Sequence, residues 1–177
     1  EYADRDKKEL ENWRKNNQRE LLGHNLLQWH LDRQWKSIRA IAKNLGIFLF
    51  GDVPFYVSKD SADVWSNRSL FSILTNSDTF LQSGVPPDYF SETGQLWGNP
   101  VYRWSRHKAS KYRWWRKRIS RHLEQVDFLR LDHFRALEAF WAIPGKDKTA
   151  ENGIWLPSPG KEILTLIKKD CGGSLPL

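Results

Sequence analysis

Two charged side chains stand at the end of an apolar run in this sequence. Residues 126–131 resemble a buried strand, and side chains along a strand alternate between its two faces. Phe128, Arg130 and Asp132 therefore share one face. Burying a charge is costly unless the charge is paired or takes part in chemistry. A carboxylate and a guanidinium at the carboxyl end of a strand are therefore typical of a catalytic site.

The same arrangement occurs earlier in the chain. The short apolar run 47–50 is followed by Gly51 and Asp52, and Phe50 shares a strand face with Asp52. If both runs belong to one parallel sheet, Asp52 and Asp132 lie at the same edge of it. The pattern alone leaves a second interpretation open, in which each aspartate only forms a turn or caps a helix.

Helices precede both runs. Gly46 follows the first set of helically spaced apolar residues, at a position where helices commonly end. A third helix is expected around residues 163–169, before a strand-like stretch at 175–177. The residues that share one helix face are Leu31, Trp35, Ile38, Ala42 and Leu45 in the first helix, and Tyr112, Trp115, Ile119, Leu123 and Val126 in the second.

Strands that alternate with helices indicate an α/β protein with a parallel sheet. Either an open doubly wound sheet or part of a (β/α)8 TIM barrel fits this pattern. The segments that follow the two strands are long, about residues 53–110 and 134–160, and rich in aromatic residues. Long ordered loops at the carboxyl ends of strands are where barrel enzymes build their active sites, so we favour the barrel.

The composition narrows the class of protein. The net charge is +7, but basic residues are interspersed with acidic ones and no nucleic-acid motif accompanies them, so we expect no nucleic-acid partner. No apolar run reaches the length of a membrane span and no signal peptide is visible, which favours the cytoplasm. The single Cys171 excludes an internal disulfide and a cysteine-based zinc site. His24 and His30 lack the spacing of metal ligands, and His133 by its position alone is a hydrogen-bonded loop residue.

Two features predict that residues 1–177 are an internal fragment, truncated at both ends. The chain of 177 residues contains no Met, and its last residues resemble the beginning of a buried strand rather than a polar terminus.

The ten Trp, nine Phe and five Tyr residues either fill a core or stack on ligands. Such aromatic residues keep an alternative open, a non-catalytic carbohydrate-binding module with an aromatic stacking surface.

Three motifs carry a specific resemblance to a known family. Residues 51–57 read GDVPFYV and residues 60–65 read DSADVW; residues 84–100 read GVPPDYFSETGQLWGNP, and residues 129–135 read LRLDHFR. In this order and spacing they resemble the amylomaltase (disproportionating enzyme) family of 4-α-glucanotransferases, which belongs to the α-amylase clan. The resemblance extends from about residue 26 to the end of the chain.

The resemblance implies part of a (β/α)8 barrel with long insertions in its βα-loops. It implies retaining transfer of α-1,4-glucan segments between maltooligosaccharides, which needs no metal or organic cofactor. Asp132 would be the nucleophile, Arg130 its neighbouring guanidinium, and Asp52 a ligand of the donor sugar. Further substrate-binding positions implied by the match are Trp97, Tyr89, Asp88, Asn99 and His133. The localisation would be cytoplasmic, or plastidic in a plant or alga, and the oligomeric state stays open.

The sequence departs from the family pattern in two ways. Ala136 follows the Arg of the nucleophile motif, where the family usually has Gly. The family's general acid/base Glu is expected beyond residue 177, so we expect the fragment alone to be inactive. Even so, Arg130 and Asp132 at a strand end favour the enzyme over the binding module, because a stacking surface needs no nucleophile.

Overall fold

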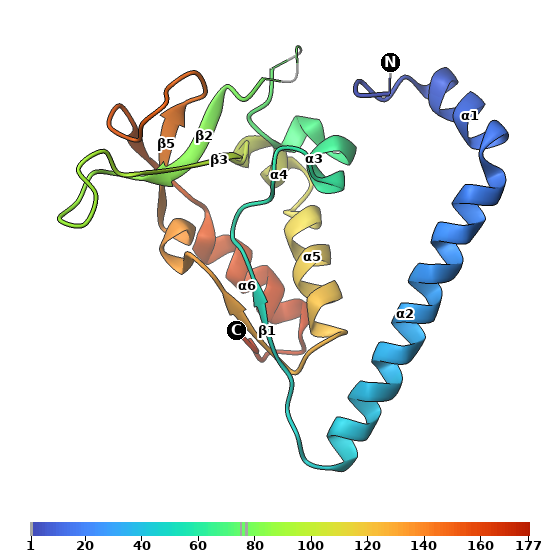
Figure 1. Cartoon of the computed structure of the whole chain (residues 1–177). Coiled ribbons are helices and arrows are strands. Elements are labelled where there is room, and N and C mark those ends of the chain that lie inside the picture. Colours follow the sequence, from blue (N-terminus) through green and yellow to red (C-terminus); the bar gives the residue numbers. More distant parts are fainter. Residues whose placement is uncertain (1, 75, 77) are drawn as a thin grey trace.

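The structure is a computed structural model that describes residues 2–74, 76 and 78–177, and its fold is mixed α/β (Figure 1). The helical elements are α1 (Lys7–Asn16), α2 (Gln18–Asn44), α3 (Ala62–Ser66), η1 (Arg68–Leu70), α4 (Trp104–Ala109), α5 (Arg113–Leu123), η2 (Phe134–Leu137) and α6 (Gly160–Asp170). The strands are β1 (Phe50–Val53), β2 (Leu81–Val85), β3 (Gln95–Pro100), β4 (Phe128–Leu131), β5 (Ala139–Pro144) and β6 (Ile154–Pro157).

Strands β1 and β4 form the predicted parallel pair. Their register aligns Asp52 with Arg130. The alternation along β4 is also as predicted, since Leu129 and Leu131 are buried while Phe128 and Arg130 are exposed. Apolar residues on the buried face pack towards the helices, and the charged residues occupy the other face.

The first strand begins later than expected. The run 47–50 was predicted to be a strand covered on both faces, but only its last residue lies in β1, and Phe48 is 71% exposed. At Leu49 the backbone N–H donates to the Asp127 carboxylate at 2.8 Å, while the carbonyl oxygen accepts from the N–H groups of Asp127 and Phe128. In the described residues, the parallel sheet has two strands and closes no barrel.

The two long segments predicted as loops contain regular structure. A second, antiparallel sheet with the order β3-β2-β5-β6 draws two strands from each segment. Its strands have four to six residues, and β2 and β3 each contain a glycine, which weakens the strand period of two in the sequence. At Gly84, an added Cβ atom would lie 2.2 Å from the carbonyl oxygen of Gln95, so β2 and β3 approach each other too closely for a side chain at this position.

An aromatic core joins α5 to the segment after β1. Tyr112, Trp115 and Ile119 of the predicted helix face are 1% exposed or less. They pack with residues from other elements, among them Phe55, Phe71, Tyr102 and Ile163. Burial of such large side chains is the main favourable contribution to folding.

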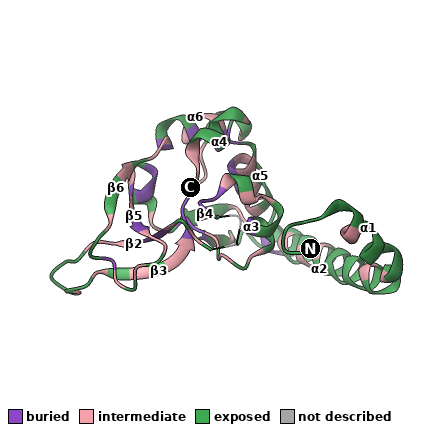
Figure 2. Cartoon of the chain, turned by 90° about the horizontal axis from the view of Figure 1, so that it is seen from above, coloured by how far each residue is buried: buried purple, intermediate pink, exposed green. Residues whose placement is uncertain are grey.

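Helix α2 stands apart from this core (Figures 1 and 2). It is helical as predicted, and Gly46 follows its cap with a φ of +70°. Of its predicted face, however, Ala42 is buried while Leu31, Ile38 and Leu45 are at least half exposed. The Trp35 indole donates to the Gln125 carbonyl at 2.7 Å, which ties the helix to the turn before β4.

The C-terminal region agrees in part with the expectation. Helix α6 covers the predicted third helix. Residues 175–177 are not in a strand, although the Leu129 N–H donates to the Pro176 carbonyl oxygen at 3.0 Å beside β4. None of the helices in the described part of the chain is both long and apolar enough to cross a membrane.

Candidate functional site

The centre of the candidate site is a guanidinium between two carboxylates. Arg130 binds Asp52 through Nη2, 2.9 Å from Oδ2, and through Nε, 3.2 Å from Oδ1. Its Nη2 also lies 3.2 Å from Oδ1 of Asp132. The three side chains come from the ends of β1 and β4, on the face opposite Leu129 and Leu131.

The backbone fixes Asp132 next to β1. The Asp132 N–H donates to the Val53 carbonyl oxygen at 2.9 Å, which extends the parallel pairing by one bond. The next residue, His133, adopts a left-handed conformation with φ of +53°, and this ends the strand. For a residue other than glycine this conformation is uncommon and is found disproportionately at functional sites.

The site is open on its charged face. The side chains of Asp52, Arg130 and Asp132 are 56–59% exposed, so the burial expected for these charges is not found in this chain. The pKa of Arg130 is raised, first by the hydrogen bond to Asp52 and then by the charges of both carboxylates. The Arg130 guanidinium therefore stays protonated, and its positive charge offsets part of the repulsion between the Asp52 and Asp132 carboxylates.

Rings from three segments gather beside the acids. The ring of Trp97, on β3, meets that of His133 edge-on, with centroids 4.8 Å apart. Tyr56, three residues after β1, lies 6.2 Å from each of these two rings. The His133 ring is partly buried, and this burial lowers its pKa; the Asp132 charge opposes that shift and the Arg135 charge adds to it.

The loop between β2 and β3 lies elsewhere. Its tip carries Tyr89, which is 97% exposed, and Figure 1 shows the loop projecting away from β1. The Asp88 carboxylate accepts hydrogen bonds from the N–H groups of Phe90 and Ser91, both at 2.9 Å, so it holds the turn. Asn99 is partly buried on β3. Among the described residues, the structure thus gathers Asp52, Arg130, Asp132, Trp97 and His133, and leaves Tyr89 and Asp88 at the loop tip.

Tyr56 is a site residue that the motifs did not predict. Its position in the GDVPFYV motif, four residues after Asp52, is a signal that could have found it. The contact with Trp97 depends on β3, a strand that the sequence pattern did not predict, so the motif alone did not indicate this neighbour.

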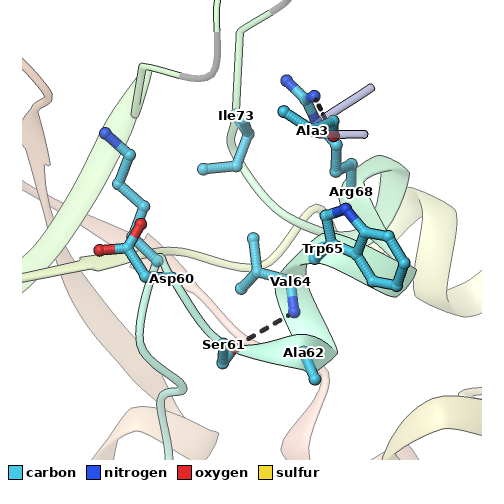
Figure 3. Close-up of a pocket in the computed structure, with 9 residues that line it drawn as sticks. Ala3, Asp60, Ser61, Ala62, Val64, Trp65, Arg68 and Ile73 are labelled. Atoms are coloured by element: carbon cyan, nitrogen blue, oxygen red, sulfur yellow. Dashed lines mark hydrogen bonds between the residues drawn. The ribbon is translucent and has the colours of Figure 1, made fainter. Parts of the chain in front are cut away.

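A cavity of about 370 Å³ has a lining that includes neither Asp52 nor Asp132; Figure 3 shows this lining. Val64 and Ile73 form its apolar part, and Trp65 and Arg68 lie at one side. The guanidinium of Arg5 covers the Trp65 ring at 4.9 Å, so that the ring is not free for stacking on a ligand. Within the described residues, none of the predicted site residues lines this cavity.

Comparisons with known proteins agree with the motifs. A family model described as 4-alpha-glucanotransferase matches residues 1–176, including the segment before residue 26 where the motifs carried no resemblance. The 4-alpha-glucanotransferase of Synechocystis sp. is 45% identical over 178 residues, which is 100% of this chain and 35% of the relative. The chloroplastic/amyloplastic 4-alpha-glucanotransferase of Oryza sativa subsp. japonica is 47% identical over 145 residues, covering 82% of this chain and 24% of the relative.

A solved structure is similar in fold over nearly the whole chain. The amylomaltase of Streptococcus agalactiae, in complex with acarbose, matches with a TM-score of 0.92 and 38% identity, over 98% of this chain and 35% of that one. The chain thus spans 35% of the length of the Synechocystis and Streptococcus proteins and 24% of that of the Oryza protein. With a family model that covers almost every residue and with relatives of this identity, the chain belongs to the 4-alpha-glucanotransferase (amylomaltase) family of carbohydrate-metabolising glycosyltransferases.

Proposed function

We propose that this segment is part of a (β/α)8 barrel that carries out retaining transfer of α-1,4-glucan segments. The parallel pair of β1 and β4, with α5 between them in the chain, has the connection that such a barrel repeats. Phe48, Phe50 and Phe128 are between 45% and 71% exposed on the face of the pair opposite the helices. In a closed barrel, further strands would cover these rings.

The chemistry that fits the site is a double displacement. The Asp132 carboxylate attacks the anomeric carbon of the donor glucan, the bond to the leaving oxygen breaks, and a glycosyl-enzyme forms. The hydroxyl of an acceptor sugar then takes up the glycosyl group, and Asp132 leaves as a carboxylate. A second carboxyl group protonates the leaving oxygen and deprotonates the acceptor; we assign it to the part of the enzyme outside this segment.

The neighbouring residues supply charge and binding surface. Arg130 places a positive charge 3.2 Å from the Asp132 carboxylate, where it can orient the attacking oxygen. We assign Asp52 to the donor sugar, and Trp97 and His133 to the acceptor side of Asp132. Tyr89, Asp88 and Asn99 belong to the aromatic loop and strand through which longer glucans would be held. The substrates are α-1,4-glucans and maltooligosaccharides, and a relative bound to acarbose supports this class.

One observation carries the proposal: a motif-matched carboxylate at a strand end lies next to a guanidinium that also binds a second acid. The test is Asp132→Asn in a full-length enzyme that carries this segment. An amide keeps the shape of the side chain but is a poor nucleophile, so maltotriose disproportionation should fall by several powers of ten, at about 1.4 kcal/mol per tenfold. The melting temperature should change little, because the amide keeps the size and shape of the carboxylate.

Asp127→Asn is the matched control. Asp127 precedes the same strand at its other end, where its carboxylate binds Arg39 and the Leu49 N–H. Its replacement should lower the melting temperature and spare activity. A variant of Asp132 that keeps more than a few per cent of wild-type activity would remove this residue from the nucleophile role.

We place the enzyme in the cytoplasm, or in the plastid if it comes from a plant or alga, as the name of the Oryza relative suggests.

A further inference from the structure

Three segments that carry the candidate site converge on one side chain. Tyr56 follows β1, which carries Asp52. Its ring lies 6.2 Å from that of Trp97 on β3, at an interplanar angle of 60°. It also lies 6.2 Å from the ring of His133, the residue after Asp132, at an angle of 33°. Tyr56 thus contacts both the His133 ring, next to Asp132, and the Trp97 ring, on the antiparallel sheet.

Tyr56 itself is firmly held. It is 5% exposed, its ring stacks on that of Tyr102 at 5.9 Å and 14°, and it meets Phe55 edge-on at 4.9 Å. The Tyr102 hydroxyl donates to the Phe55 carbonyl oxygen at 2.5 Å. Arg118 donates to the same carbonyl at 3.1 Å. The rings behind Tyr56 therefore belong to the rigid core.

Trp97 is held less firmly. Its side chain lies at the surface, and its indole N–H donates to the exposed Gln95 amide oxygen at 3.1 Å. The next residue, Gly98, has a φ of +75°, which allows the strand to bend here. The ring contacts with His133 and Tyr56 are therefore the main constraints on the orientation of this indole.

We propose that Tyr56 is a positioning residue: its ring, which the core holds in place, fixes the orientation of the Trp97 and His133 rings. Rings held in this way favour attack on the glycosyl-enzyme by the acceptor sugar over attack by water. This inference rests on the proposed function. The ring rather than the hydroxyl carries the effect, because the hydroxyl is buried and has no hydrogen-bond partner among the described residues. Such a hydroxyl contributes nothing that a phenylalanine would lose.

The test compares Tyr56→Leu and Tyr56→Phe in a full-length enzyme that carries this segment. Hydrolysis of maltotriose increases the number of reducing ends and transfer does not, so reducing ends report hydrolysis while chromatography of the products reports transfer. Loss of an aromatic contact should raise the hydrolysis share in Tyr56→Leu by about three- to tenfold and increase the KM for acceptor more than it lowers kcat. Tyr56→Phe should behave as wild type.

Phe71→Leu is the matched control. Phe71 is fully buried in the same core and contacts Tyr102 and Trp114. Phe71→Leu should lower the melting temperature as Tyr56→Leu does, but it should leave the ratio of transfer to hydrolysis products unchanged. If Phe71→Leu shifts the ratio equally, the effect is general loosening and the inference is overturned. Should Tyr56→Leu not fold, Tyr56→Met, which fills more of the space, takes its place.

A second measurement does not depend on activity. NMR titration of His133, assigned with His133→Gln, reports its surroundings, in which Asp132 and Arg135 are the charged neighbours. Burial beside Tyr56 lowers the pKa of His133, so Tyr56→Leu should bring it closer to the ordinary value and Tyr56→Phe should not. If the wild-type enzyme transfers glucan segments but Tyr56→Leu changes neither the His133 titration nor the product ratio, the inference is overturned. A wild type without transfer overturns the proposed function instead, and the titration still tests Tyr56.

Discussion

Asp52 and Arg130 are register partners across the parallel pair β1–β4, and they are also chemical partners. Two atoms of the guanidinium contact the two carboxylate oxygens of Asp52, at 2.9 and 3.2 Å, whereas one atom contacts Asp132, at 3.2 Å. The acid assigned to the donor sugar and the acid assigned as nucleophile thus share one cation. A change in the position of either carboxylate alters the charge that the other experiences.

Arg130→Lys tests this sharing. Lysine keeps the positive charge but lacks the planar fork that contacts two groups at once. We expect kcat to fall at least about tenfold, with little change in stability because lysine keeps the positive charge between the two acids. Kinetics on maltotriose and urea unfolding are the measurements. Arg121→Lys, at another exposed arginine between two acids, should leave kcat unchanged. Full activity in Arg130→Lys would show that charge alone suffices.

Trp97→Ala tests the aromatic side of the site. We expect transfer to sugar acceptors to weaken more than formation of the glycosyl-enzyme, so that the hydrolysis share rises, because the indole helps to exclude water. The product ratio and the melting temperature are measured together. Trp65→Ala is the control, since Trp65 is 38% exposed against 36% for Trp97 and lies on α3. A sharp fall in melting temperature with an unchanged ratio would assign Trp97 to packing alone.

Residues 1–177 by themselves should not convert maltotriose into longer and shorter products. The segment spans about a third of its relatives, and loss of general acid–base assistance alone costs on the order of 100- to 10,000-fold in rate. The exposed rings of Phe48, Phe50 and Phe128 should also make it prone to association. Chromatography of the products and light scattering are the measurements. Robust transfer by the pure segment would contradict both the prediction and the assignment of the acid/base group to the rest of the enzyme.

His107 should make the fold sensitive to acid. It is fully buried among aromatic rings, and this burial lowers its pKa to about 4, against the opposing effect of the Leu70 carbonyl. Because its folded pKa lies below the unfolded value of about 6.5, its neutral form stabilises the fold above pH 6.5. This contribution is lost as the pH falls from there through about 4. Between pH 7 and pH 5, wild type should lose ~2 kcal/mol more than His107→Gln, which does not titrate.

Urea unfolding of both proteins at each pH measures this difference. Carboxylates that titrate in the same range affect wild type and variant equally, so the comparison isolates His107. Equal losses in the two proteins would show that His107 does not remain neutral in its buried site.

Local sequence was enough to predict several elements. The helix face of Tyr112, Trp115 and Ile119 is buried as predicted, since a repeat of 3.6 residues places these side chains on one side whatever surrounds them. The alternation along β4 was predicted for the same kind of reason. The antiparallel sheet was not, because each of its strands is short and is stabilised by strands distant in the chain, such as β5 beside β2.

The candidate site, too, was predicted from the sequence only in part. Sequence alone determined that Asp52 and Asp132 end apolar runs on defined strand faces, because the period of a strand is a local property. Only the tertiary structure decided that Arg130 binds Asp52 more closely than Asp132, and that Tyr56 lies against Trp97 and His133. The contacts of Arg130 with Asp52 and of Tyr56 with the two rings join residues more than 40 positions apart, and they arise from packing of whole elements, which no short sequence pattern encodes.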